Sequence, residues 1–166
     1  MTMPNTYTDK NETGCCAVPN IKDWQDKIIT IENQIFIRMH TKSFMFVPIN
    51  MSSVMTKLNK FAIDHHANMP PQKAMILSRD LSPWKAEQLF AVNKNIEGFD
   101  MVVLNGNFAT KVFEGPYNKV KNWYKELIEY AKTYNKDVGR IYFFYTTCPR
   151  CAKNYGKNFV IGMAEI

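Results

Sequence analysis

The chain contains 166 residues, 46% of them hydrophobic and 22% charged, which is the balance of one globular domain or one duplicated domain. No apolar run approaches the roughly 20 residues needed to span a bilayer, and residues 1–20 lack the apolar stretch of a signal peptide, so we expect a cytoplasmic protein without a membrane partner. The formal net charge is +6, but the lysines are dispersed and accompany no helix-turn-helix or finger spacing, which argues against a nucleic-acid partner.

The first half of the chain begins with a polar N-terminal extension, residues 1–34. A strand is predicted at residues 35–46, which are rich in apolar and β-branched side chains. Pro48 ends this strand, because proline cannot donate to a sheet, and Asn50 is a suitable N-cap for the helix that follows. The apolar face of that helix is formed by Val54, Leu58 and Phe61.

Two short strands complete the first half, at residues 74–78 and 88–93, and the turn between them carries Trp84. A second long strand is then predicted at residues 101–113, which repeat the apolar character of the first. The order of elements therefore starts again at residue 101.

The second half follows the same order after its long strand. Pro116 marks the turn, and Asn118 is the candidate cap of the next helix. The apolar stripe of this helix consists of Val120, Trp123, Leu127, Ala131 and Tyr134. Strands are expected at residues 140–146 and 158–164, with a loop at 147–157 between them.

A weak internal duplication supports this reading. Sliding the sequence by 68 positions places Pro48 on Pro116 and Asn50 on Asn118. We therefore predict an α+β fold in which duplicated strand-helix-strand-strand units form an antiparallel sheet with two helices on one face. The halves, about residues 35–95 and 100–166, should fold as one domain, residues 35–166, with a small-molecule cleft between the helices.

One segment resembles a known family. Residues 113–117, Phe-Glu-Gly-Pro-Tyr, close a long strand and precede a helix that carries Trp123, and in this respect the chain resembles the second half of the GyrI-like domain. Cys15-Cys16 combined with the late segment 146–158 resembles a subgroup of uncharacterised bacterial proteins that are often loosely labelled hydrolases.

This resemblance implies a small-molecule-binding fold. GyrI-like relatives serve as effector domains of multidrug-sensing regulators, as a gyrase-inhibitory protein and as hydrolases of cyclopropane-bearing natural products. The present sequence lacks the DNA-binding helix pair of the regulators and adds a cysteine loop. It therefore looks like a stand-alone domain that binds a small hydrophobic molecule, either neutral or cationic, in the cleft between the helices, with hydrolysis of that molecule as the enzymatic extension.

Glu114 is the first candidate for catalysis. It ends a strand dense in apolar residues, on the parity of Leu104, Phe108 and Val112. A carboxylate in an aromatic pocket attracts a cationic ligand or, with a raised pKa, acts as a general acid or base. The alternative is a solvated carboxylate at a strand end.

Aromatic residues and one histidine are the candidates for ligand binding. Aromatic faces bind flat apolar or cationic ligands, and tyrosine hydroxyls orient them. Trp123 lies on a helical stripe, where a role in the core competes with a role in the pocket, and His40 lies on a polar strand face that competes with solvent exposure. The candidate pocket residues are His40, Trp84, Tyr117, Trp123 and Tyr145.

The four cysteines form two pairs, Cys15-Cys16 and Cys148-Pro149-Arg150-Cys151. Together they could complete an all-thiolate structural zinc site that ties the N-terminal segment to the late loop. The Cys-x-x-Cys spacing also occurs in thiol oxidoreductases, and ordinary unpaired thiols are the third interpretation. The alternative function is therefore a zinc-stapled or thiol-based interaction module that binds a protein partner without enzymatic activity.

Overall fold

The computed structural model describes residues 1–166 and confirms an α+β fold with an antiparallel sheet. Three α-helices accompany the strands, together with short 3-10 turns at Pro71–Lys73 and Tyr117–Lys119. The strands are β1 Lys27–Phe44, β2 Val47–Pro48, β3 Ile76–Ser82, β4 Lys85–Val92, β5 Met101–Glu114, β6 Ile141–Tyr145 and β7 Phe159–Glu165. The helices are α1 Met51–Asp64, α2 Val120–Lys132 and α3 Pro149–Tyr155.

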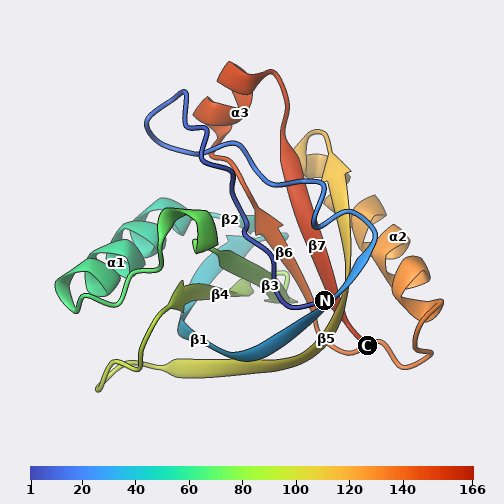
Figure 1. Cartoon of the computed structure of the whole chain (residues 1–166), viewed down its shortest axis with the longest axis horizontal. Coiled ribbons are helices and arrows are strands. Elements are labelled where there is room, and N and C mark those ends of the chain that lie inside the picture. Colours follow the sequence, from blue (N-terminus) through green and yellow to red (C-terminus); the bar gives the residue numbers. More distant parts are fainter.

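Six strands close into a barrel in the order β1-β4-β3-β6-β7-β5, because β5 also pairs with β1 (Figure 1). The sequence-based prediction gave an antiparallel sheet but not its closure into a barrel. Strand β1 begins at Lys27, and its first residues, as far as Ile31, pair with residues 106–110 of β5. An irregularity between Ile31 and Gln34 bends β1, so that one strand can contribute to both sides of the barrel.

The barrel is filled by a cluster of fourteen buried residues. Its largest fully buried side chain is Trp24, which precedes β1 and packs with Phe36 and Phe108. The indole nitrogen of Trp24 donates to the carbonyl of Asn5 at 3.0 Å. The N-terminal segment therefore contributes to the core of the barrel.

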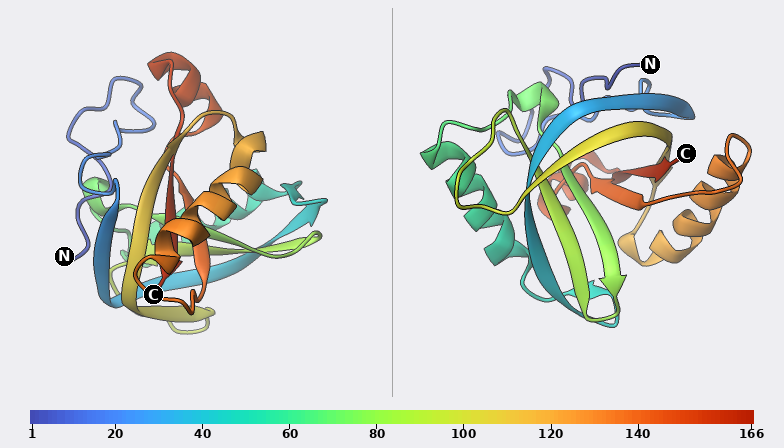
Figure 2. Two further views of the ribbon diagram at one scale, coloured as in Figure 1. Left: turned by 90° about the vertical axis from the view of Figure 1, so that its right-hand side faces the viewer. Right: turned by 90° about the horizontal axis from the view of Figure 1, so that it is seen from below.

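Helices α1 and α2 lie on the outside of the barrel, on opposite sides (Figures 1 and 2). Helix α1 packs on β1 and β4 through Val54, Leu58 and Ala62. Helix α2 packs on β5, β6 and β7 through the stripe predicted from the sequence, of which Trp123, Leu127 and Ala131 are buried. It approaches β7 closely at Gly162, where a Cβ atom would lie 2.7 Å from the side chain of Leu127.

Asn50 is the N-cap residue of α1, as predicted, but without the predicted side-chain bond, whereas the prediction of Asn118 as the cap of α2 is wrong. The Asn50 side chain accepts a hydrogen bond from the Lys42 amide at 2.7 Å and makes no cap bond to α1. It fixes the turn after β1 instead. Asn118 lies inside the 3-10 turn Tyr117–Lys119, so that α2 begins only at Val120.

The predicted loop at residues 147–157 contains the short helix α3. In Figure 1, α3 projects from one end of the barrel, beside the N-terminal segment. That segment is fastened there by the Tyr7 hydroxyl, which donates to the carbonyl of Thr146 at 2.7 Å. No helix of this structure combines the length and the apolar character needed to cross a bilayer.

Candidate metal centre

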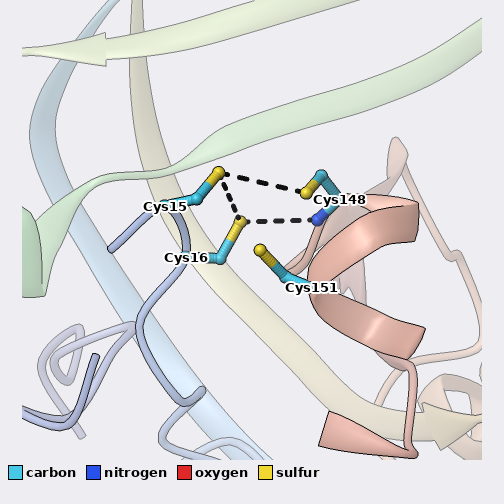
Figure 3. A group of neighbouring side chains, drawn as sticks. All are labelled: Cys15, Cys16, Cys148 and Cys151. Atoms are coloured by element: carbon cyan, nitrogen blue, oxygen red, sulfur yellow. Dashed lines mark hydrogen bonds between the residues drawn. The ribbon is translucent and has the colours of Figure 1, made fainter. Parts of the chain in front are cut away.

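The first cysteine pair lies in a turn built around Thr13. The Thr13 hydroxyl oxygen accepts hydrogen bonds from the amides of Cys15 and Cys16, at 3.3 and 3.2 Å. A threonine side chain that accepts from amides two and three residues later stabilises a compact turn. The turn presents both thiols on the same side of the segment (Figure 3).

The second pair lies at the start of α3. Cys148 is the N-cap residue, Pro149 occupies the first turn, and Cys151 follows in that turn, fully buried. Proline suits this position because its missing N–H would have no helical partner. The helix ends at Gly156, whose φ of 70° is the left-handed conformation that favours glycine.

The two pairs meet, although about 130 residues separate them in the sequence. All four Sγ atoms lie within 4.8 Å of one another. The Sγ of Cys15 is 3.7 Å from that of Cys16 and 4.0 Å from that of Cys148. In Figure 3 the four side chains point toward one another. None of these cysteines forms a disulfide.

The sulfur positions suit a tetrahedral metal site. Four thiolates about 2.3 Å from one Zn²⁺ lie about 3.8 Å apart, close to the sulfur separations of 3.7 and 4.0 Å found here. The amide of Cys148 also points to the Sγ of Cys16 at 3.5 Å, an interaction that stabilises a negatively charged sulfur. The four residues could therefore hold one metal ion with small adjustments of their side chains.

The thiols influence one another's ionisation. A hydrogen bond with the Thr13 hydroxyl, 3.3 Å away, lowers the pKa of Cys151 to about 6. Burial raises the pKa of Cys16. A first thiolate in this cluster opposes the formation of a second, so full deprotonation requires a compensating cation.

Two tyrosines hold the cysteine segments together independently of any metal. Tyr155 of α3 donates its hydroxyl to the carbonyl of Cys16, and Tyr7 donates to Thr146, two residues before Cys148. Sequence reasoning missed these tyrosines and Thr13. The signal for Thr13 was its place two residues before a cysteine pair, and Tyr155 lies four residues after Cys151, one helical turn away.

Two of the predicted pocket residues lie together, next to this centre. The rings of Tyr117 and Tyr145 meet edge to face with centroids 5.4 Å apart. The Tyr117 hydroxyl donates to the carbonyl of Thr147, the residue before Cys148, at 3.1 Å. Burial raises the pKa values of both tyrosines, so that they keep their hydroxyl protons.

The other predicted site residues are dispersed. Glu114 is exposed at the end of β5, where its backbone pairs with Phe159. Trp123 is buried beneath α2 and stacks on Phe113. Trp84 is 55% exposed in the β3–β4 turn, and His40 is exposed on β1.

A cavity of about 420 Å³ opens where β3 and β6 separate, beneath α2. Only one strand position, Ser78 opposite Phe143, pairs these two strands. The polar side chains of its lining include Asp80, whose carboxylate makes no hydrogen bond and whose pKa is raised by partial burial. The lining also includes the side chains of Tyr124, Arg140, Tyr145 and Glu165.

Comparison with protein families gives one result. A family model described as "Bacterial hydrolase" matches residues 6–166, which include the four cysteines and the whole cavity lining. None of the curated proteins matches the sequence.

Proposed function

The chain belongs to the bacterial hydrolase family, and we propose that it is a zinc-binding member in which Cys15, Cys16, Cys148 and Cys151 hold one structural Zn²⁺. The observation that carries this proposal is the convergence of four thiols within 4.8 Å from two distant segments. Unpaired surface thiols have no physical reason to gather in this way.

A structural role follows from the number of ligands. Catalytic zinc sites keep one position open for water or substrate, whereas four cysteines fill a tetrahedral zinc completely. The ion would cross-link the turn at Thr13–Cys16 to α3 and so fasten the N-terminal segment to the end of the barrel. A redox role would require only Cys148 and Cys151 and would leave the approach of Cys15 and Cys16 unexplained.

The test is the metal content of protein purified under reducing conditions without added zinc. We expect about one zinc per chain, together with loss of the metal and a fall in Tm of about 10 °C or more in Cys151→Ser. Lys153→Ser is the matched control, since Lys153 is exposed on the same helix and offers no thiol. It should keep both the metal and the Tm.

Two outcomes would contradict a zinc centre. The first is metal-free protein whose Tm is unchanged by Cys151→Ser. The second is metal-free protein with a reversible disulfide between Cys148 and Cys151, which would support the redox interpretation instead.

Hydrolysis of a small molecule is a second candidate function, favoured by the family description and by the cavity beneath α2. The cavity combines two tyrosines with the unpaired Asp80 carboxylate, which has the raised pKa expected of a general base. Glu114, the sequence-based candidate for catalysis, lies outside this lining at the exposed end of β5 and is the competing candidate. Tyr145 lines the cavity and is the proposed ligand-orienting residue, with Tyr117 packed against its ring from outside the lining.

Asp80→Asn and Glu114→Gln, assayed in parallel, separate the two carboxylates. With p-nitrophenyl esters as probes, we expect Asp80→Asn to lower turnover about 100-fold. Glu126→Gln on the exposed face of α2 is the control and should leave the rate unchanged. If the unaltered protein hydrolyses no ester above the buffer rate, esterase activity in this cavity is rejected. If only Glu114→Gln is inactive, Glu114 takes the role.

We also propose that the chain is related to GyrI-like domains and that its two halves arose by duplication. The order of elements supports them: β1-α1-β3-β4 is followed by β5-α2-β6-β7, apart from the inserted α3 and the short β2. Each of α1 and α2 covers the outer face of strands from its own half. Shared ancestry of the halves would explain this order.

A further inference from the structure

Seven large apolar side chains are exposed on two neighbouring turns at one end of the molecule. None of them belongs to the segments that carry the cysteines. They come from the turn between β1 and β2 with the residues beside it, and from the β3–β4 turn. Their exposed fractions range from 42% to 67%. We call this set the apolar tip: Phe44, Met45, Phe46, Val47, Ile49, Leu81 and Trp84.

The two turns form one unit. The amide of Ser43 donates to the carbonyl of Trp84 at 2.8 Å, and the amide of Phe46 donates to that of Pro83 at 2.9 Å. The rings of Phe44 and Trp84 lie with centroids 5.6 Å apart. In Figure 2 the ends of these strands extend beyond the body of the barrel, so the apolar tip is a protrusion.

Two residues of the tip have a backbone conformation that is unfavourable for their residue types. Met45 and Phe46 have φ values of 49° and 69°, in the left-handed region where asparagine and glycine are preferred. Bulky apolar residues at such positions reduce stability and, when exposed, solubility. Strain at an exposed turn is the kind of observation from which a functional role can be inferred.

Unneutralised positive charge lies directly behind the tip. Lys42 on β1 faces Lys85 on β4 across the sheet, both are exposed, and neither takes part in a salt bridge. Like charges in directly opposed positions destabilise a sheet. The sequence contains no aspartate or glutamate from residue 33 to residue 63.

We propose that the apolar tip binds the surface of an anionic membrane. Phe44, Phe46 and Trp84 would enter the boundary between headgroups and acyl chains, where aromatic side chains are favoured, while Lys42 and Lys85 contact lipid phosphates. Charge complementarity favours this partner, because the lysine pair gains an opposite charge there. The sequence predicted no membrane partner because it contains no apolar run long enough to span a bilayer, but binding at a membrane surface requires no such run.

Tryptophan fluorescence with lipid vesicles tests the proposal on the full chain. Trp24 and Trp123 are buried and Trp84 is exposed, so a shift of emission on adding vesicles reports the tip. We expect a blue shift and co-sedimentation with vesicles of phosphatidylcholine and phosphatidylglycerol, a much weaker effect with phosphatidylcholine alone, and reversal by high salt.

The double variant Met45→Asn with Phe46→Gly separates binding from folding. Both residues suit left-handed turns, so the variant should melt no lower than the unaltered protein while vesicle binding falls about tenfold or more. Val103→Ser, an equally exposed apolar site on β5, is the control and should bind normally. Zinc content, measured on the same samples, should be unchanged by either variant.

Three results would overturn the proposal. The first is no binding to anionic vesicles, and the second is equal binding by the double variant. The third is a concentration-dependent dimer, detected by sedimentation velocity, that the double variant abolishes and that added vesicles do not dissociate. That last result would assign the apolar tip to a second copy of the chain.

Discussion

Glu165 and Arg140 form the best-defined ion pair of the molecule. Glu165 accepts hydrogen bonds from the Arg140 amide at 3.1 Å and from its guanidinium at 2.8 and 3.0 Å. These bonds lower the pKa of Glu165 below its ordinary value. Since the folded pKa is lower than the unfolded one, the pair stabilises the fold above the unfolded pKa of about 4.3, and this contribution is lost as the pH falls through the folded value.

Glu165→Gln should therefore cost about 1 kcal/mol of unfolding free energy at pH 7, a value kept small because the pair is partly solvated. At about pH 3 the variant and the unaltered protein should be nearly equal in stability. Urea unfolding at the two pH values measures this difference. Asp64→Asn, which removes an exposed i,i+4 pair with Lys60, is the control and should change stability little at either pH. An equal effect of Glu165→Gln at both pH values would contradict the assignment.

At the scale of elements, the metal centre connects α3 to the N-terminal segment. The start of the N-terminal segment is also held to the barrel by the amides of Thr6 and Tyr7, which donate to the Gln72 carbonyl, but the turn at residues 13–16 is joined to α3 chiefly through Thr13 and the Tyr155 hydroxyl. Removing a structural metal should therefore loosen these two segments before the barrel opens.

Hydrogen exchange after chelation measures this effect. We expect faster exchange in residues 6–20 and 146–158, and unchanged exchange in α2, whose buried face packs on the barrel. Faster exchange throughout the chain would mean that the ion maintains the entire fold, and no change in either segment would contradict its role as a cross-link.

Regular sequence patterns were sufficient to predict some of these elements but not others. Both long helices were predicted because their apolar spacing is regular over about two turns in α1 and about four in α2. The start of β1 was missed because residues 32–34, Glu-Asn-Gln, interrupt the apolar pattern at the irregularity of that strand. Helix α3 was missed because seven residues carry too little periodicity, although Pro149 and Gly156 mark its two ends.

At the scale of the whole molecule, the closed barrel determines which predicted residues can meet. The four cysteines were predicted as ligands from residue type and spacing alone, and the fold brings them together. The cavity could not be predicted in this way. Asp80 lies beyond the predicted end of its strand, and its approach to Tyr145 depends on the separation of β3 and β6, which no local pattern encodes.

The closed barrel also separates three features of the molecule. The metal centre lies at α3, the cavity lies beneath α2, and the apolar tip lies at the turns of β1–β2 and β3–β4. Cys151, Asp80 and the turn residues Met45 and Phe46 share no hydrogen bond with one another, so the effects of their substitution on stability should be close to additive. Metal content, ester hydrolysis and vesicle binding can therefore be assigned to different residues by the variants described above.

X-ray absorption at the zinc edge of the purified full chain probes the metal centre most directly. Four cysteine ligands from this chain predict a first shell of four sulfur atoms at about 2.3 Å, with no nitrogen or oxygen neighbour. A shell that contains nitrogen or oxygen, or protein that carries no metal when purified without added zinc, would contradict the account.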